Sequence, residues 1–219
     1  MKKGFARNYL SAIVFTVLFI VFTLVIRFID VDNIGPQGSP VGLAHINGPF
    51  FETFGYNKVL YTVSELLGYV AIGVAAGFAA YGVWQLIKLK SLKKVDPKLI
   101  CLGAFYAVVI AFYALFEVVV VNYRPVLSDE GLEASYPSSH TMLAVCVFGS
   151  AIIMIKDLFA QNRQLKLCAI TILVLLMAAV VVTRLFSGVH WLTDIIGGII
   201  LSLGLCFIFK GVTEQTGNK

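Results

Sequence analysis

Residues 167–185, LCAITILVLLMAAVVVTRL, indicate the fold of this chain. The stretch carries no charge before Arg184, and a helix of ~20 apolar residues is enough to cross the ~30 Å hydrocarbon core of a bilayer. Five further runs of this kind occur at 10–28, 61–87, 99–121, 138–155 and 191–209. The sequence therefore predicts an all-α, polytopic membrane protein: a six-transmembrane-helix bundle forming a single membrane-embedded domain over residues 1–219.

Composition supports this class. Of the 219 residues, 59% are hydrophobic and 13% are charged, whereas charged residues make up about a quarter of a soluble domain. The net charge of +5 does not indicate a nucleic-acid partner, because the basic residues follow the ends of the apolar runs. All the cysteines lie inside predicted helices, where a thiol behaves as a small apolar group, so no disulfide framework is expected.

The basic residues also predict the orientation in the membrane. Of the 17 lysines and arginines, most fall at the N-terminus, in the connections at 88–98 and 156–166, and at the C-terminal end with Lys210 and Lys219. Four lie at the opposite helix ends: Arg27, Lys58, Arg124 and Arg184. Since basic residues are enriched on the cytoplasmic side, we expect a plasma-membrane protein with both termini in the cytoplasm.

One long connection lies on the predicted outer side, at about 30–58. It contains several glycines and prolines, followed by an apolar and aromatic segment at 41–56. This pattern predicts an outer loop that leads into a short interfacial helix. His45 in this loop has no catalytic neighbours in the sequence and is expected at the surface. Glu65, near the start of the second predicted helix, is either close to the polar cluster described next or a solvated helix end.

Polar residues gather at the predicted outer ends of the helices. Charged groups near the membrane core are costly and therefore typical of functional sites. The cluster combines Arg124 beyond the third helix, Ser138, Ser139 and His140 at the start of the fourth, Thr183 and Arg184 at the end of the fifth, and His190 and Asp194 at the start of the sixth.

These residue types suit the chemistry of a phosphoryl group. The two arginines supply forked donors that match phosphate oxygens, and the helix start at Ser138 is expected to offer free backbone N–H groups. His190 and Asp194 are four residues apart, so we expect the carboxylate to hydrogen-bond one imidazole nitrogen and leave the other free to attack. His140 would then protonate the leaving oxygen. The set predicts phosphoryl transfer through a phosphohistidine.

Three segments, at 117–125, 137–140 and 183–194, resemble the motifs of the type 2 phosphatidic acid phosphatase superfamily, which also contains soluble vanadium haloperoxidases. The resemblance implies an acid phosphatase/vanadium haloperoxidase-like core. It implies that His190 is the nucleophile, Asp194 its orienting carboxylate and His140 the general acid. It also implies phosphate binding, without a metal or other cofactor, by Arg124, Ser138, Ser139 and Arg184.

The sequence departs from the usual motifs at three positions. Ser139 stands where glycine is more common and Thr183 where serine is more common; both changes are mild. Glu117 stands where lysine is more common, which removes a positive charge from the predicted phosphate-binding site and adds a negative one. Glu117 and Arg124 are seven residues apart, a spacing that shares one helical face, so an ion pair between them is expected. Glu117 and Thr183 are therefore candidate modulators of the site.

These observations favour an integral membrane lipid phosphatase that hydrolyses a lipid phosphate monoester or diphosphate at the outer face. The resemblance implies undecaprenyl diphosphate, phosphatidylglycerophosphate or phosphatidic acid as the substrate, and the residues do not select one. Two alternatives stay open: a lipid phosphotransferase that uses the same histidine, and a catalytically silent relative that binds a lipid phosphate. Membrane lipids are the other expected partners. The sequence carries no indication of the oligomeric state.

Overall fold

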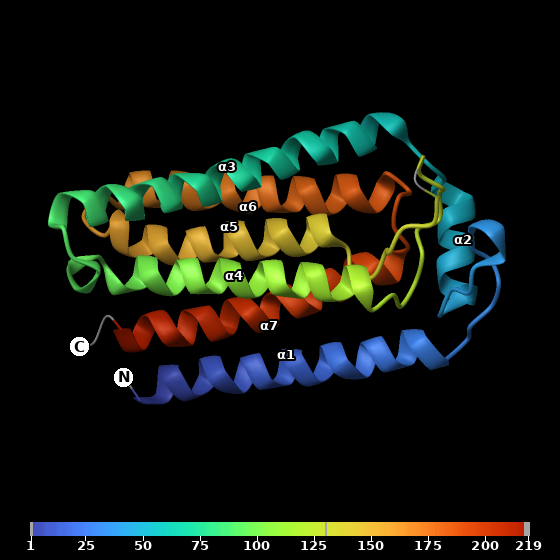
Figure 1. Ribbon diagram of the computed structural model, residues 1–219, viewed down its shortest axis with the longest axis horizontal. Helices are drawn as coiled ribbons and strands as arrows, with labels where there is room; N and C mark the ends of the chain where they lie inside the picture. Colours follow the sequence, from blue (N-terminus) through green and yellow to red (C-terminus); the bar gives the residue numbers. More distant parts are fainter. Residues whose placement is uncertain (1, 130, 217–219) are drawn as a thin grey trace.

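The computed structural model describes residues 2–129 and 131–216 as an elongated bundle of helices (Figure 1). Within these residues, six helices are long and apolar enough to cross a membrane, which confirms the predicted number and class. They are α1 (Lys2–Phe28), α3 (Lys58–Leu89), α4 (Pro97–Val118), α5 (Ser139–Leu158), α6 (Arg163–Phe186) and α7 (Leu192–Thr216). Lys219, one of the basic residues counted for orientation, lies outside the described residues.

Side chains that accept backbone N–H groups mark the beginnings of three helices. Asn57 accepts from Leu60 at the start of α3, and Asn162 accepts from Leu165 at the start of α6, both at 3.0 Å. Asp96 caps α4, where Pro97 occupies the first turn and needs no hydrogen-bond partner. These helices begin within four residues of the starts that the apolar runs predict.

The end of α4 differs from the expected one. The sequence predicts a helix to residue 121, but α4 ends at Val118. Beyond it, the chain pairs with the segment that precedes α5: Arg124 N donates to Glu133 O at 3.0 Å, and Ser135 N donates to Asn122 O at 2.9 Å. This pairing satisfies backbone groups that a longer helix would have satisfied internally, and it brings the two extended segments together next to α7.

Helices α5 and α7 form the centre of the bundle. Buried residues make up 56% of the α5 span and 50% of the α7 span, against 22% or less in the other four. Gly197 and Gly198 permit this packing, because a Cβ at Gly198 would lie 3.0 Å from Ser138 O and one at Gly197 would collide with the Tyr136 ring. The small-residue pair predicted for close packing therefore serves that purpose.

The end of the bundle away from both termini is covered by the connection between α1 and α3 (Figure 1). It contains a short 3₁₀ helix, η1 (Pro36–Gly38), and α2 (Ala44–Phe54), as the predicted loop and short helix require. The turn between α6 and α7 packs directly beneath it. Gly188 there has φ +68°, and a Cβ would collide with the backbone of Gly55. Only glycine fits this approach without strain.

Candidate active site

The structure brings the predicted polar cluster together at the end of the bundle that α2 covers. Ser139 and His140 lie in the first turn of α5, Arg184 lies in the last turn of α6, and Asp194 lies in the first turn of α7. The extended segment after α4 contributes Arg124, and the turn before α7 contributes His190. Residues from four separate segments therefore share one depth in the bundle, as the sequence predicts.

The two arginines are held by carboxylates but keep donors unused. Arg184 is fully buried, and its Nη1 lies 2.7 Å from Glu65 Oε1 and 3.1 Å from Ser64 Oγ. Arg124 Nη1 lies 2.9 Å from Glu133 Oε2. Within the described chain, Arg184 Nε and Nη2 and Arg124 Nε have no hydrogen-bond partner. Unpartnered buried donors are costly, so this arrangement is suited to an incoming anion.

Glu65 belongs to the site and is not a solvated helix end. Its Oε1 atom lies 3.2 Å from His140 Nε2 and 2.7 Å from Arg184 Nη1. This one carboxylate of α3 thus connects α5 and α6. His140 Nδ1 is buried and unpartnered among the described residues. Gly68, one turn along α3, leaves space for the ring, since a Cβ there would lie 3.0 Å from His140 Cδ2.

The expected direct hydrogen bond between Asp194 and His190 is absent. Asp194 Oδ2 and His190 Nδ1 are 3.7 Å apart. The Ser135 hydroxyl lies between them, 2.5 Å from Asp194 Oδ2 and 3.0 Å from His190 Nδ1. The prediction fails because His190 precedes α7, which begins at Leu192, so the four-residue helical spacing does not set this contact. His190 Nε2 is buried and has no partner within the described chain.

His190 is held in its neutral form. Burial, followed by the positive charges of Arg184 and Arg124, lowers the pKa of His190 well below its ordinary value. A neutral imidazole whose Nδ1 carries the proton has its lone pair on Nε2, where it is available for nucleophilic attack. The turn that carries His190 is itself fixed, since Trp191 Nε1 donates to Tyr123 O at 2.6 Å and Trp191 N donates to Asp194 Oδ2 at 2.9 Å.

The start of α5 differs from the expectation in one donor. Ser138 N donates to Asp194 O at 3.0 Å, so this amide is not free for a phosphate. The Ser138 hydroxyl accepts weakly from Thr141 N at 3.4 Å, which is the geometry of a helix cap. The amides of Ser139 and His140 follow in the first turn, where a helix offers no internal acceptor. The anion-binding character of the helix start therefore falls one residue later than predicted.

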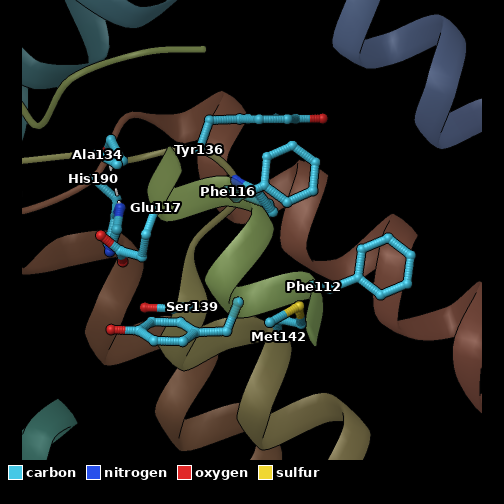
Figure 2. Close-up of a pocket in the computed structure, with 11 residues that line it drawn as sticks. Phe112, Phe116, Glu117, Ala134, Tyr136, Ser139, Met142 and His190 are labelled. Carbon is cyan, nitrogen blue, oxygen red and sulfur yellow. Dashed lines mark hydrogen bonds between the residues drawn. The ribbon is translucent and has the colours of Figure 1, made fainter. Parts of the chain in front are cut away.

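Glu117 does not pair with Arg124 as expected. The carboxylate that binds Arg124 is Glu133, and helical spacing cannot connect Glu117 to Arg124 because α4 ends between them. Glu117 instead lines a narrow cavity of about 10 Å³ together with Ser135, Ser139 and His190 (Figure 2). This space holds about one water molecule. The Glu117 side chain, which replaces the more common lysine, thus lines the same cavity as His190, the histidine expected to attack.

Two other positions that the sequence analysis considered make local contacts. Thr183, a candidate modulator, donates its hydroxyl to Ala179 O at 2.6 Å within α6. His45 is exposed, as expected, and its ring Nδ1 pairs with Asp30. The functional neighbours that sequence reasoning missed are Ser135, Asn122 and Glu133. Two of them could have been considered from the sequence, because Glu133 and Ser135 lie just before the motif at 137–140.

Comparisons with known proteins identify the family of this chain. Residues 104–216 match the PAP2 superfamily. Phosphatidylglycerophosphatase B of Bacillus subtilis (strain 168) is 33% identical over 95 residues, which cover 43% of this chain and 45% of that relative. The match thus spans less than half the length of the curated relative.

A solved structure shares the fold. The crystal structure of a transmembrane PAP2 type phosphatidylglycerolphosphate phosphatase from Bacillus subtilis superimposes with a TM-score of 0.66 at 18% identity, covering 94% of this chain and 96% of that one. The family match covers more than half of the chain and includes every motif residue from Glu117 to Asp194. The protein is a multi-pass membrane protein of the PAP2 superfamily.

Proposed function

We propose that this protein is a lipid phosphatase that hydrolyses a phosphate monoester or diphosphate through a phosphohistidine on His190, without a metal. The observation that carries the proposal is the set of unpartnered buried atoms: His190 Nε2 and donors of Arg124 and Arg184 lack partners in the described chain, and the charges of both arginines act on the His190 ring. A nucleophile beside unfilled anion donors is the arrangement that phosphoryl transfer requires.

The reaction follows from these positions. His190 Nε2 forms a bond to phosphorus as the bond to the leaving oxygen breaks, and His140 gives that oxygen a proton. The arginine guanidiniums and the first-turn amides of α5 stabilise the charge on the other phosphoryl oxygens. In the second step, His140 takes a proton from water, the water oxygen attacks phosphorus, and His190 is released with inorganic phosphate. Glu65 contacts both His140 and Arg184, so it orients the general acid and a phosphate-binding guanidinium relative to each other.

An apolar groove beside the site supports a lipid substrate. It has a volume of about 540 Å³ and runs between α3 and α4 over the surface of α5, with Ser139 and His140 at its polar end. Its walls are almost wholly apolar, including Ile72, Ala76 and Ile110. An acyl or prenyl chain in this groove would place its phosphate at His140. Similarity to phosphatidylglycerophosphatase B adds phosphatidylglycerophosphate to the substrates to be tested first.

The proposal is tested by phosphate release from detergent-purified protein with a chelator present. Undecaprenyl diphosphate, phosphatidylglycerophosphate and phosphatidic acid are supplied separately, and the ranking of kcat/KM identifies the substrate. We expect chelator-resistant release from at least one lipid. Release that requires an added alcohol acceptor would indicate a phosphotransferase. Absence of release from all three lipids would contradict the phosphatase proposal.

Filling the groove should separate lipid from soluble substrates. Ala76→Trp is expected to lower kcat/KM for the preferred lipid about tenfold, a loss of roughly 1.4 kcal/mol, because the indole occupies the space of the chain. Hydrolysis of p-nitrophenyl phosphate, which has no chain, should change less than twofold. Val70→Trp is the matched control, since Val70 is exposed on α3 outside the groove. Equal losses for both substrates would contradict lipid binding here.

The site is proposed to face the outside, with both termini in the cytoplasm. The support is the excess of basic residues at the terminal end, where the lysine-rich connection of α3 and α4 also lies. A cysteine introduced by Glu52→Cys in α2 should react with a membrane-impermeant maleimide in intact cells. One introduced by Lys93→Cys should react only after permeabilisation, with the parent chain as background. The opposite pattern would reverse the orientation.

A further inference from the structure

Ser135 occupies the space in which a direct contact between His190 and Asp194 was expected. The residue is buried, with 2% of its surface exposed. Its hydroxyl is 2.5 Å from Asp194 Oδ2 and 3.0 Å from His190 Nδ1, whereas the carboxylate and the imidazole are 3.7 Å apart. Its position is fixed by the main chain, since Ser135 N donates to Asn122 O at 2.9 Å.

The hydrogen-bonding capacity of the Ser135 hydroxyl determines where the protons lie among Ser135, His190 and Asp194. A serine hydroxyl has one proton to donate and lone pairs to accept with. The short contact to Asp194 Oδ2 uses the proton, because an ionised carboxylate only accepts. The contact to His190 must then be a bond donated by Nδ1–H to Ser135 Oγ. The imidazole proton is thereby placed on Nδ1, and the lone pair on Nε2, the atom that is buried without a partner in the described chain.

Among the described residues, the other hydrogen bonds of the Asp194 carboxylate do not involve the imidazole. Asp194 Oδ2 also accepts from Trp191 N at 2.9 Å, and Oδ1 is 3.5 Å from Asn122 Nδ2. These donors hold the carboxylate behind Ser135. We propose that Ser135 is a positioning residue through which Asp194 acts on His190, and that its hydroxyl fixes the tautomer with the lone pair on Nε2.

This role rests on the proposed function, in which His190 attacks phosphorus. As the Nε2–phosphorus bond forms and the bond to the leaving oxygen breaks, positive charge appears on the imidazole. The hydrogen bond from Nδ1–H to Ser135 strengthens, and the Asp194 charge behind it stabilises the cation. No proton moves along this group; the leaving oxygen takes its proton from His140. Ser135 therefore affects the rate of attack and not the binding of the phosphate.

The test compares Ser135→Ala with the parent. We expect kcat to fall about 100-fold with KM within twofold, by analogy with the loss of one oriented donor. Ser202→Ala is the matched control, because Ser202 is also buried and its hydroxyl bonds, among the described residues, to main-chain oxygens of Met142 and Gly198. Should the alanine variant fail to fold, Ser135→Cys keeps the volume with a much weaker hydrogen-bonding group and should show the same loss.

Two measurements separate this role from a structural one. Nitrogen-15 NMR of His190 should show the Nδ1–H tautomer in the parent and a mixture in Ser135→Ala, whether or not turnover is seen. Asp194→Asn should cost much less in the Ser135→Ala background than in the parent, because the two act in series. An unchanged tautomer, or equal costs of Asp194→Asn in both backgrounds, would overturn the proposal. The parent's failure to release phosphate would instead overturn the proposed function.

Discussion

His190→Gln should abolish phosphate release, with a fall in kcat on the order of 10⁴-fold or more, as for loss of other catalytic nucleophiles. Glutamine keeps a polar side chain of similar reach but has no nucleophilic nitrogen. His190 Nε2 is a buried ring nitrogen without a partner in the described chain, and the charges of Arg124 and Arg184, which keep unused donors, act on this ring. With a ³²P-labelled lipid, the parent quenched in alkali should carry protein-bound phosphate that is released by acid, and His190→Gln should carry none.

His45→Gln provides the control for this variant. His45 lies at the same end of the bundle but is exposed, with 87% of its side chain accessible, and it pairs with Asp30. Its replacement should leave kcat within twofold of the parent. If His190→Gln retained more than about a hundredth of the parent rate, or if the labelled phosphate persisted, another residue would be the nucleophile.

The pH dependence of the parent follows from the same residue. The pKa of His190 is lowered by burial and by the charges of Arg184 and Arg124, and only the neutral ring attacks. Protonation therefore removes activity at a lower pH than for an ordinary histidine, whose pKa is about 6.5. The acid limb that His190 contributes to kcat/KM is expected below that value.

The positions of the helices along the chain were predictable from the sequence because each span carries its own signal. The apolar run at 167–185 stands alone as a helix, whatever its neighbours do, and α6 (Arg163–Phe186) contains it fully. The end of α4 had no such signal. Residues 119–121 are apolar and continue the run, but pairing between Arg124 and Glu133 main-chain groups takes the segment out of the helix. The end of α4 therefore depends on pairing with the segment that precedes α5, which a run of apolar residues does not reveal.

The candidate site, like the fold, was predictable from the sequence only in part. Its depth was predictable, since the topology places the helix ends that carry His140, Arg184 and Asp194, and the segment with Arg124, on the same side of the membrane. The contacts within it were not. Two expected contacts are absent, an ion pair of Glu117 with Arg124 and a direct hydrogen bond of Asp194 with His190. Both expectations applied helical spacing to a pair in which one residue lies outside the helix. Local rules of this kind hold only within one regular element.

Arg184 provides the second large expected effect. Arg184→Gln should lower kcat/KM by about 10³-fold, and Arg184→Lys by about 10²-fold, in the range measured for removal of a donor to a developing oxyanion. The guanidinium is fully buried, uses Nη1 for Glu65 and Ser64, and keeps Nε and Nη2 without partners in the described chain. Lysine restores the charge but not the fork, so it cannot both hold Glu65 and bind two phosphoryl oxygens.

The pH profile shows whether the loss of kcat/KM in the Arg184 variants reflects weaker stabilisation of the phosphoryl group or a disturbed fold. Arg184 lowers the pKa of His190 by its charge, so its removal raises that pKa, and protonation silences the nucleophile at a higher pH. The acid limb of kcat/KM should therefore move to higher pH in Arg184→Gln and stay near the parent position in Arg184→Lys. Arg27→Gln, at an exposed position on α1, should alter neither rate nor profile. Loss of activity in Arg184→Gln with an unmoved acid limb would indicate that Arg184 supports the helix packing and not the phosphoryl group.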